Sequence, residues 1–60
     1  MTAEEIKAIR HALGLTQEQF ADRLEVARST IARWETGVRA PQSKYVVRRL
    51  EALAKKAQKR

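Results

Sequence analysis

The feature that most constrains the fold is a pair of helix-start signals in the first third of the 60-residue chain. Thr2 and Glu5 form a T-x-x-E capping box, in which each side chain accepts a hydrogen bond from the other residue's backbone N–H. Thr16 and Gln19 repeat this arrangement. Two separate helices are therefore expected in the N-terminal half of the chain.

Two glycines mark where helices should stop. Gly14 and Gly37 each follow a stretch with helical spacing of apolar residues, and glycine readily adopts the positive φ that ends a helix. We expect the first helix to stop before Gly14. A short second helix should end at a break over residues 25–27, and a third helix should run from Arg28 to about Thr36.

A fourth helix should begin near Ser43, a plausible N-cap, and run to Lys56 or beyond. Pro41 precedes it and biases Ala40 away from helical geometry, so residues 38–42 form a connector. Apolar residues recur along this helix at i, i+4, i+7 and i+11, namely Val46, Leu50, Leu53 and Ala57. The expected fold is all-α, a compact bundle of four helices, with five as the alternative.

Composition excludes several classes of function. The chain has no Cys and one His, His11, so it offers no thiolate, Cys nucleophile or multi-histidine metal site. It also lacks a Gly-rich phosphate loop and a convergent carboxylate pair. We therefore expect no enzymatic activity, no cofactor, no metal and no small-molecule substrate.

Two further absences bear on location. No apolar run approaches the ~18 residues of a membrane span, and the acidic start at Glu4 and Glu5 is unlike a secretory signal. We expect a cytoplasmic protein without membrane association.

Charge is unevenly distributed along the chain. Thirteen Lys and Arg against seven Asp and Glu give a net charge of +6. Residues 1–26 carry three bases and five acids, whereas residues 27–60 carry ten bases and two acids. Such a basic half favours a polyanionic partner, with nucleic acid first. The alternative is a solvated basic face that serves solubility alone.

Two short helices separated by about three residues are typical of a helix-turn-helix unit, in which the second helix enters the DNA major groove. Here the second carries polar residues at its start. The motifs are Leu-Gly-Leu-Thr-Gln at 13–17, Phe-Ala-Asp-Arg-Leu at 20–24, Arg-Ser-Thr-Ile-Ala-Arg-Trp-Glu-Thr-Gly at 28–37, and Pro41. With these motifs the chain, from Ile6 to about Leu53, resembles the phage Cro/repressor (Xre-like) helix-turn-helix family.

The resemblance implies a lambda-repressor-like DNA-binding domain over residues 1–57, with its helix-turn-helix unit at about 17–36 and a basic tail at 58–60. It also implies a sequence-specific regulator of transcription that binds double-stranded DNA. The simplest form is a nucleoid-associated repressor that binds a palindromic operator as a homodimer. One candidate dimer surface is formed by Val46, Leu50 and Leu53.

Site residues follow from the resemblance and from side-chain chemistry. Arg28, Ser29 and Arg33 are expected to contact base edges, because arginine's planar fork matches the guanine O6 and N7 atoms. A phosphate contact or free solvation is the alternative for both arginines. The expected phosphate contacts are Gln17, Thr30, Thr36, Arg39 and Lys44. A solvated surface position is the alternative for the last four. Gln17 could instead simply fill the first turn of its helix.

The resemblance also implies a structural ion pair between Arg10 and Glu35. The alternative is a screened surface pair of little energetic value. The residues expected in the core are Phe20, Leu24, Val26, Ile31 and Trp34. Ala21 is interpreted as small because two helices approach closely there.

Two residues depart from the family's pattern. Glu25 stands where the turn usually has a glycine, in a position that often needs positive φ. Ala27 replaces the usual Ser or Thr that caps the third helix.

A second class of function remains open, a protein-interaction module such as an antitoxin or a bridging factor in transcription complexes. A protein partner would then replace DNA as the main ligand. RNA binding is less favoured, because Phe20 and Trp34 are expected in the core and only Tyr45 is left for base stacking.

Overall fold

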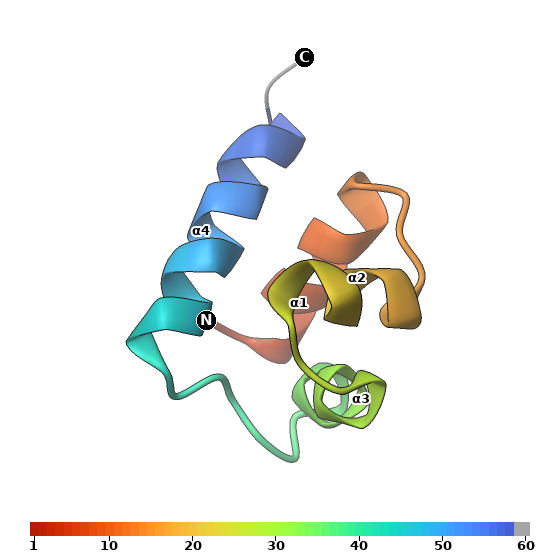
Figure 1. Cartoon of the computed structure of the whole chain (residues 1–60), viewed down its shortest axis with the longest axis vertical. Coiled ribbons are helices and arrows are strands. Elements are labelled where there is room, and N and C mark those ends of the chain that lie inside the picture. The colour runs from red at the N-terminus through yellow and green to blue at the C-terminus, as the bar shows by residue number, and fades with distance from the viewer. Residues whose placement is uncertain (59–60) are drawn as a thin grey trace.

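The computed structural model describes residues 1–58, and in that range the chain forms four helices and no strand (Figure 1). The helices are α1 (Ala3–Ala12), α2 (Gln17–Leu24), α3 (Arg28–Thr36) and α4 (Lys44–Gln58). The predicted all-α fold is confirmed, and residues 1–58 contain no fifth helix. Helix α4 continues to Gln58, the first residue of the expected basic tail, and residues 59–60 of that tail lie outside the described residues.

Both capping boxes are formed. The Thr2 Oγ1 accepts from the Glu5 backbone N–H at 3.1 Å, and the Glu5 carboxylate accepts from the Thr2 N–H at 2.7 Å. The corresponding distances for Thr16 and Gln19 are 3.1 and 3.0 Å. These reciprocal bonds satisfy N–H groups that have no partner inside the helix, which explains why α1 and α2 begin where the sequence predicts.

The helix ends also follow local chemistry. Gly14 and Gly37 have φ of 70° and 83°, as their positions after α1 and α3 require. Glu25 ends α2 in the same left-handed region, with φ 59°, and it is the one non-glycine residue with positive φ in the described chain. Ala27 makes no side-chain hydrogen bond at the start of α3. The two departures from the family's pattern thus have the expected effects: Glu25 adopts a positive φ, and α3 begins without a side-chain cap.

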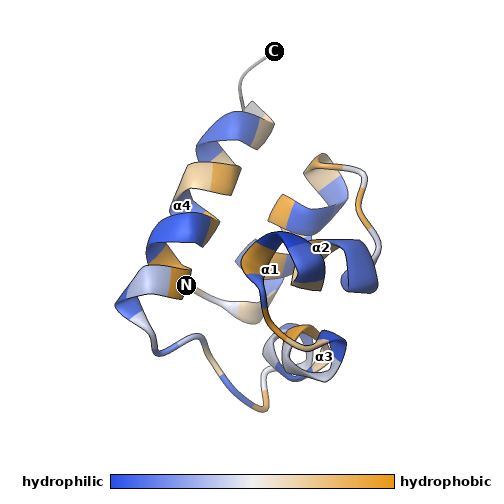
Figure 2. Cartoon of the chain, in the orientation of Figure 1, coloured by the Kyte–Doolittle hydropathy of each residue, from blue (hydrophilic) through white to orange (hydrophobic). Residues whose placement is uncertain are grey.

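The core lies where the four helices meet. Helix α3 packs on α1 and α2, and α4 packs on α1 and α2. The buried apolar residues of this core are Ile6, Ile9, Phe20, Ala21, Leu24, Ile31, Trp34 and Leu50. Figure 2 shows hydrophobic and hydrophilic residues following one another in bands along α4, as the helical spacing predicts.

The apolar stripe of α4 is directed into this core. Leu50 is fully buried, and Val46 and Leu53 pack against the cluster. Leu50 is therefore unavailable to a second copy of the chain, whereas Val46 and Leu53 are half-buried, and their place at a dimer surface stays a prediction. In so small a domain the Leu50 side chain is needed to complete the domain's own core.

One tertiary link was not predicted from the sequence. The Arg49 guanidinium of α4 donates from Nη2 to the backbone carbonyl of Arg23 at 2.9 Å, in the last turn of α2. It also donates from Nη1 to the Tyr45 hydroxyl at 3.1 Å, and its Cζ lies 5.7 Å from the centre of that ring. The last carbonyls of a helix lack partners inside the helix and favour a cation. Arg49 supplies that cation and so links α4 to the end of α2.

Candidate nucleic-acid interface

Helix α3 has two chemically different faces. Ile31, Trp34 and Glu35 are buried against the rest of the domain. The three residues expected to contact bases, Arg28, Ser29 and Arg33, are all exposed. The helix is thus held by one face and presents hydrogen-bond donors on the other.

The residues expected to contact phosphate differ in their surroundings. Thr36, Arg39 and Lys44 are exposed, whereas Thr30 and Gln17 are half-buried. The Thr36 hydroxyl donates to the backbone carbonyl of Arg33 at 3.1 Å, so part of its hydrogen-bonding capacity is already used within α3.

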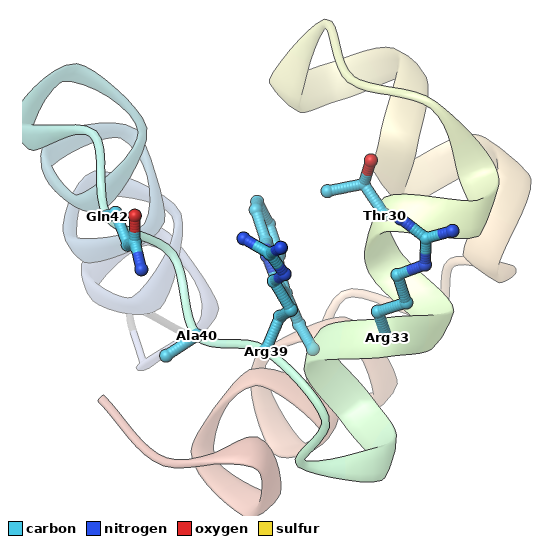
Figure 3. Close-up of a pocket in the computed structure, with 6 residues that line it drawn as sticks. Thr30, Arg33, Arg39, Ala40 and Gln42 are labelled. Carbon is cyan, nitrogen blue, oxygen red and sulfur yellow. The ribbon is translucent and has the colours of Figure 1, made fainter.

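A hollow of about 390 Å³ separates α3 from the connector to α4. Thr30 and Arg33 lie on its α3 side, Gln42 lies on the connector side, and the Arg39 side chain extends between them (Figure 3). Ala40 completes the connector side. The structure therefore brings one predicted base contact and two predicted phosphate contacts to a single concave surface.

Gln42 was missed in the sequence analysis. It is an exposed polar residue next to a proline, and no local signal distinguishes it from the other exposed polar residues. Its part in this hollow depends on how the connector folds back past α3.

A second hollow, of about 630 Å³, lies where the start of α2 approaches the start of α3. It brings together Gln17, expected at a phosphate, and Arg28, expected at a base. Arg10, Thr16 and Glu18 complete its lining. The N-terminus of a helix favours an anion because its backbone N–H groups lack partners, and Arg28 adds a positive charge beside it.

Two residues that line this hollow, Arg10 and Gln17, belong to a hydrogen-bond network around the buried Glu35. Arg10 donates from Nε to Glu35 Oε2 at 2.7 Å and from Nη2 to Oε1 at 3.1 Å, and Gln17 donates from Nε2 to Oε1 at 3.2 Å. The structure thus pairs Arg10 with Glu35 and adds Gln17, which sequence reasoning had not connected to either. Arg10 also donates to the Leu15 carbonyl at 3.0 Å and contacts the His11 ring nitrogen at 3.1 Å.

The environment of Glu35 shifts its acidity in two opposing directions. Burial raises the pKa of the Glu35 carboxyl, but hydrogen bonds from Arg10 and Gln17, together with the charges of Arg10 and Lys7, outweigh burial. The net pKa lies below the ordinary value of 4.5. Glu35 is therefore ionised at neutral pH and serves as an acceptor for its two partners.

Within residues 1–58, no group of three or more His, Cys, Asp or Glu side chains is placed to hold a metal ion. None of the four described helices is both long enough and apolar enough to cross a membrane. What the surface offers is a set of cationic and amide donors along α3, its connector and the start of α2.

Comparison with known proteins adds one decisive observation. A family model described as helix-turn-helix, of the Cro/repressor (Xre-like) type, matches residues 6–59, nearly the whole chain. The chain belongs to this family. No match was found among curated proteins or solved structures. In a helix-turn-helix domain of this type α2 and α3 form the motif, and α3 is the recognition helix.

Membership makes the chain a DNA-binding regulator of a non-enzymatic family. The exposed face of α3 carries Arg28, Ser29 and Arg33. The two hollows flank the recognition helix, one at its start and one beside its connector.

Proposed function

We propose that this chain represses transcription by binding a specific duplex DNA sequence with α3 in the major groove. The observation that carries the proposal is the division of α3 into a buried face and an exposed face with Arg28, Ser29 and Arg33. A helix anchored in this way can enter the groove without disturbing the core. The first turn of a recognition helix contacts base edges, and Arg28 and Ser29 occupy that turn.

The two arginines of α3 would give specificity. A guanidinium can donate two parallel hydrogen bonds to guanine, and each such contact discriminates by ~1–3 kcal/mol. We therefore expect G·C pairs in the preferred site. Gln17, Thr30, Thr36, Arg39 and Lys44 would contact phosphates and fix the orientation of α3 in the groove, without reading sequence themselves.

We further propose that the protein acts as a homodimer on a palindromic operator. One copy of α3 spans only a few base pairs, and paired half-sites about 34–36 Å apart double the sequence that is read. Leu50 is buried in the core, so the dimer surface would use other residues. Such a protein would work on the nucleoid in the cytoplasm.

Selection of binding sites from a random duplex library tests this proposal. The experiment uses ~0.15 M salt, because lower salt inflates sequence-independent attraction to the phosphate backbone. Enrichment of a palindrome with G·C-containing half-sites is the expected result. A single short half-site would contradict the dimer, but not sequence-specific binding.

The opposite outcome is equally informative. If no sequence is enriched and binding falls steeply as salt rises, the chain has only a basic surface. A protein-interaction role, as an antitoxin or a bridging module, would then replace the repressor proposal.

A further inference from the structure

One carboxylate connects three helices of this domain. Glu35 lies in the last turn of α3 and is 7% exposed. Its two oxygens accept hydrogen bonds from Arg10 of α1 and from Gln17 of α2. Because Gln17 is the first residue of α2 and lines the hollow shared with Arg28, the buried carboxylate touches a residue at the candidate DNA surface.

The chemistry of this contact fixes the direction of the Gln17 amide. An ionised carboxylate is only an acceptor, whereas a glutamine amide has two N–H donors on one side and an acceptor oxygen on the other. The Nε2 atom faces Glu35 Oε1 at 3.2 Å. A flipped amide would set two acceptors against each other. With one N–H held by Glu35, the planar amide fixes the direction of its second N–H.

We propose that Glu35 is a positioning residue for DNA binding, which holds the Gln17 amide so that its second N–H is ready to donate to a phosphate. The inference rests on the proposed function and deepens it. Glu35 itself never touches DNA. Its effect is to remove the rotamer freedom that Gln17 would otherwise lose on binding.

Simple electrostatics predicts the opposite effect, which makes the proposal testable. A negative charge close to the interface repels a polyanion, so neutralising Glu35 should tighten binding if charge alone matters. If positioning matters more, Glu35→Gln weakens binding, because a neutral amide at residue 35 no longer fixes the Gln17 amide in one orientation. Glu18→Gln is the matched control, since Glu18 is exposed beside Gln17 and loses the same charge.

The experiment is a double-mutant cycle on affinity for the duplex enriched in the selection above. We expect Gln17→Ala to lower affinity about tenfold and Glu35→Gln about threefold. Glu18→Gln removes a negative charge from the lining of the same hollow and should raise affinity. In the Gln17→Ala background, Glu35→Gln should cause no further loss. An equal loss in both backgrounds, or a gain from Glu35→Gln alone, would overturn the inference.

A second measurement needs no DNA and begins with the wild-type protein. Side-chain amide resonances of the wild-type protein report hydrogen bonding through proton exchange with water. The Gln17 amide should exchange more slowly than that of Gln42, because the Gln17 amide donates a hydrogen bond to Glu35 whereas Gln42 is exposed. Glu35→Asp, which keeps the charge but shortens the side chain, should speed the exchange of Gln17. Equal exchange at Gln17 and Gln42 in the wild type would overturn the inference.

The outcomes separate the inference from the proposed function. A wild-type protein that enriches no duplex overturns both. If the wild type binds but Gln17→Ala has no effect, Gln17 contacts no phosphate, and the inference fails while sequence-specific binding stands. If Gln17→Ala weakens binding and the cycle shows no coupling, only the role of Glu35 is lost.

Discussion

Arg10 and Glu35 form a two-pronged salt bridge across 25 residues of sequence, with donor–acceptor distances of 2.7 and 3.1 Å. Their side chains are only 14% and 4% exposed. The pair joins α1 to the recognition helix. Arg10 also donates a hydrogen bond to the carbonyl of Leu15, so the same side chain holds the turn between α1 and α2. At this burial, removing one partner leaves the other charge without compensation.

We therefore expect Glu35→Gln to lower the free energy of unfolding by about 2 kcal/mol. That loss is large for a chain whose total stability should be about 3–9 kcal/mol. Urea denaturation followed by circular dichroism measures it. Glu51→Gln is the control, because Glu51 is exposed on α4. Equal stability of the two variants would show that the bridge is a weak surface pair.

The same pair should make stability depend on pH in acid. The pKa of Glu35 is lower in the folded chain than its ordinary value of 4.5, so the folded state binds this proton less readily. The stability that Glu35 contributes is therefore complete above about pH 5 and is lost as pH falls through its folded pKa.

The measurement is the difference in unfolding free energy between wild type and Glu35→Gln from pH 7 to pH 3. The difference should stay constant to about pH 5 and then shrink. Glu5, whose pKa is also lowered, chiefly by hydrogen bonds with Thr2, is present in both proteins and cancels. If the difference in unfolding free energy grew as the pH fell, the pKa of Glu35 could not be lowered in the folded chain.

Glu25→Gly should stabilise the domain. Glu25 has φ 59°, a conformation that costs a non-glycine residue roughly 1–2 kcal/mol. Glycine relieves this strain but gains freedom in the unfolded chain, so we expect a net gain of about 0.5–1 kcal/mol in urea denaturation. Glu25→Ala removes the charge without relieving the strain. A similar gain from Glu25→Ala would assign the effect to charge.

Arg49→Met tests the link between α4 and the end of α2. Methionine keeps an unbranched apolar stem but removes the donors to the Arg23 carbonyl and the Tyr45 hydroxyl. We expect a loss of about 1 kcal/mol in thermal denaturation. Arg48→Met changes the same chemistry at an exposed neighbouring position and should be close to neutral. If both variants unfold at the same temperature, the hydrogen bonds of Arg49 add nothing to stability.

Arg33→Ala should relax the choice of base at one position of each half-site and weaken binding by ~1–3 kcal/mol. Binding-site selection repeated with the variant reveals which position is relaxed. Lys55→Ala removes one positive charge from the last turn of α4 and should leave the preferred sequence unchanged. Uniform weakening across all sequences would place Arg33 on a phosphate instead.

The helices of this protein were predictable because their boundaries are set by neighbouring residues. The two capping boxes, Gly14 and Gly37 each act within a few residues. Val47 donates to the Ser43 carbonyl at 3.0 Å, so α4 also begins at its predicted position. Helical spacing of apolar residues likewise indicated the core, since the side that a helix buries repeats with its turn.

Neighbouring residues were therefore enough to predict the four helices, their apolar faces, the strained turn at Glu25 and the family. The packing of the helices was needed to show that Gln17 meets Glu35, that Arg49 reaches the end of α2, and that Leu50 of α4 is fully buried. The two hydrogen-bonded contacts join residues 18 and 26 positions apart. Local chemistry cannot choose such partners, because they are selected by the packing of whole helices around one core.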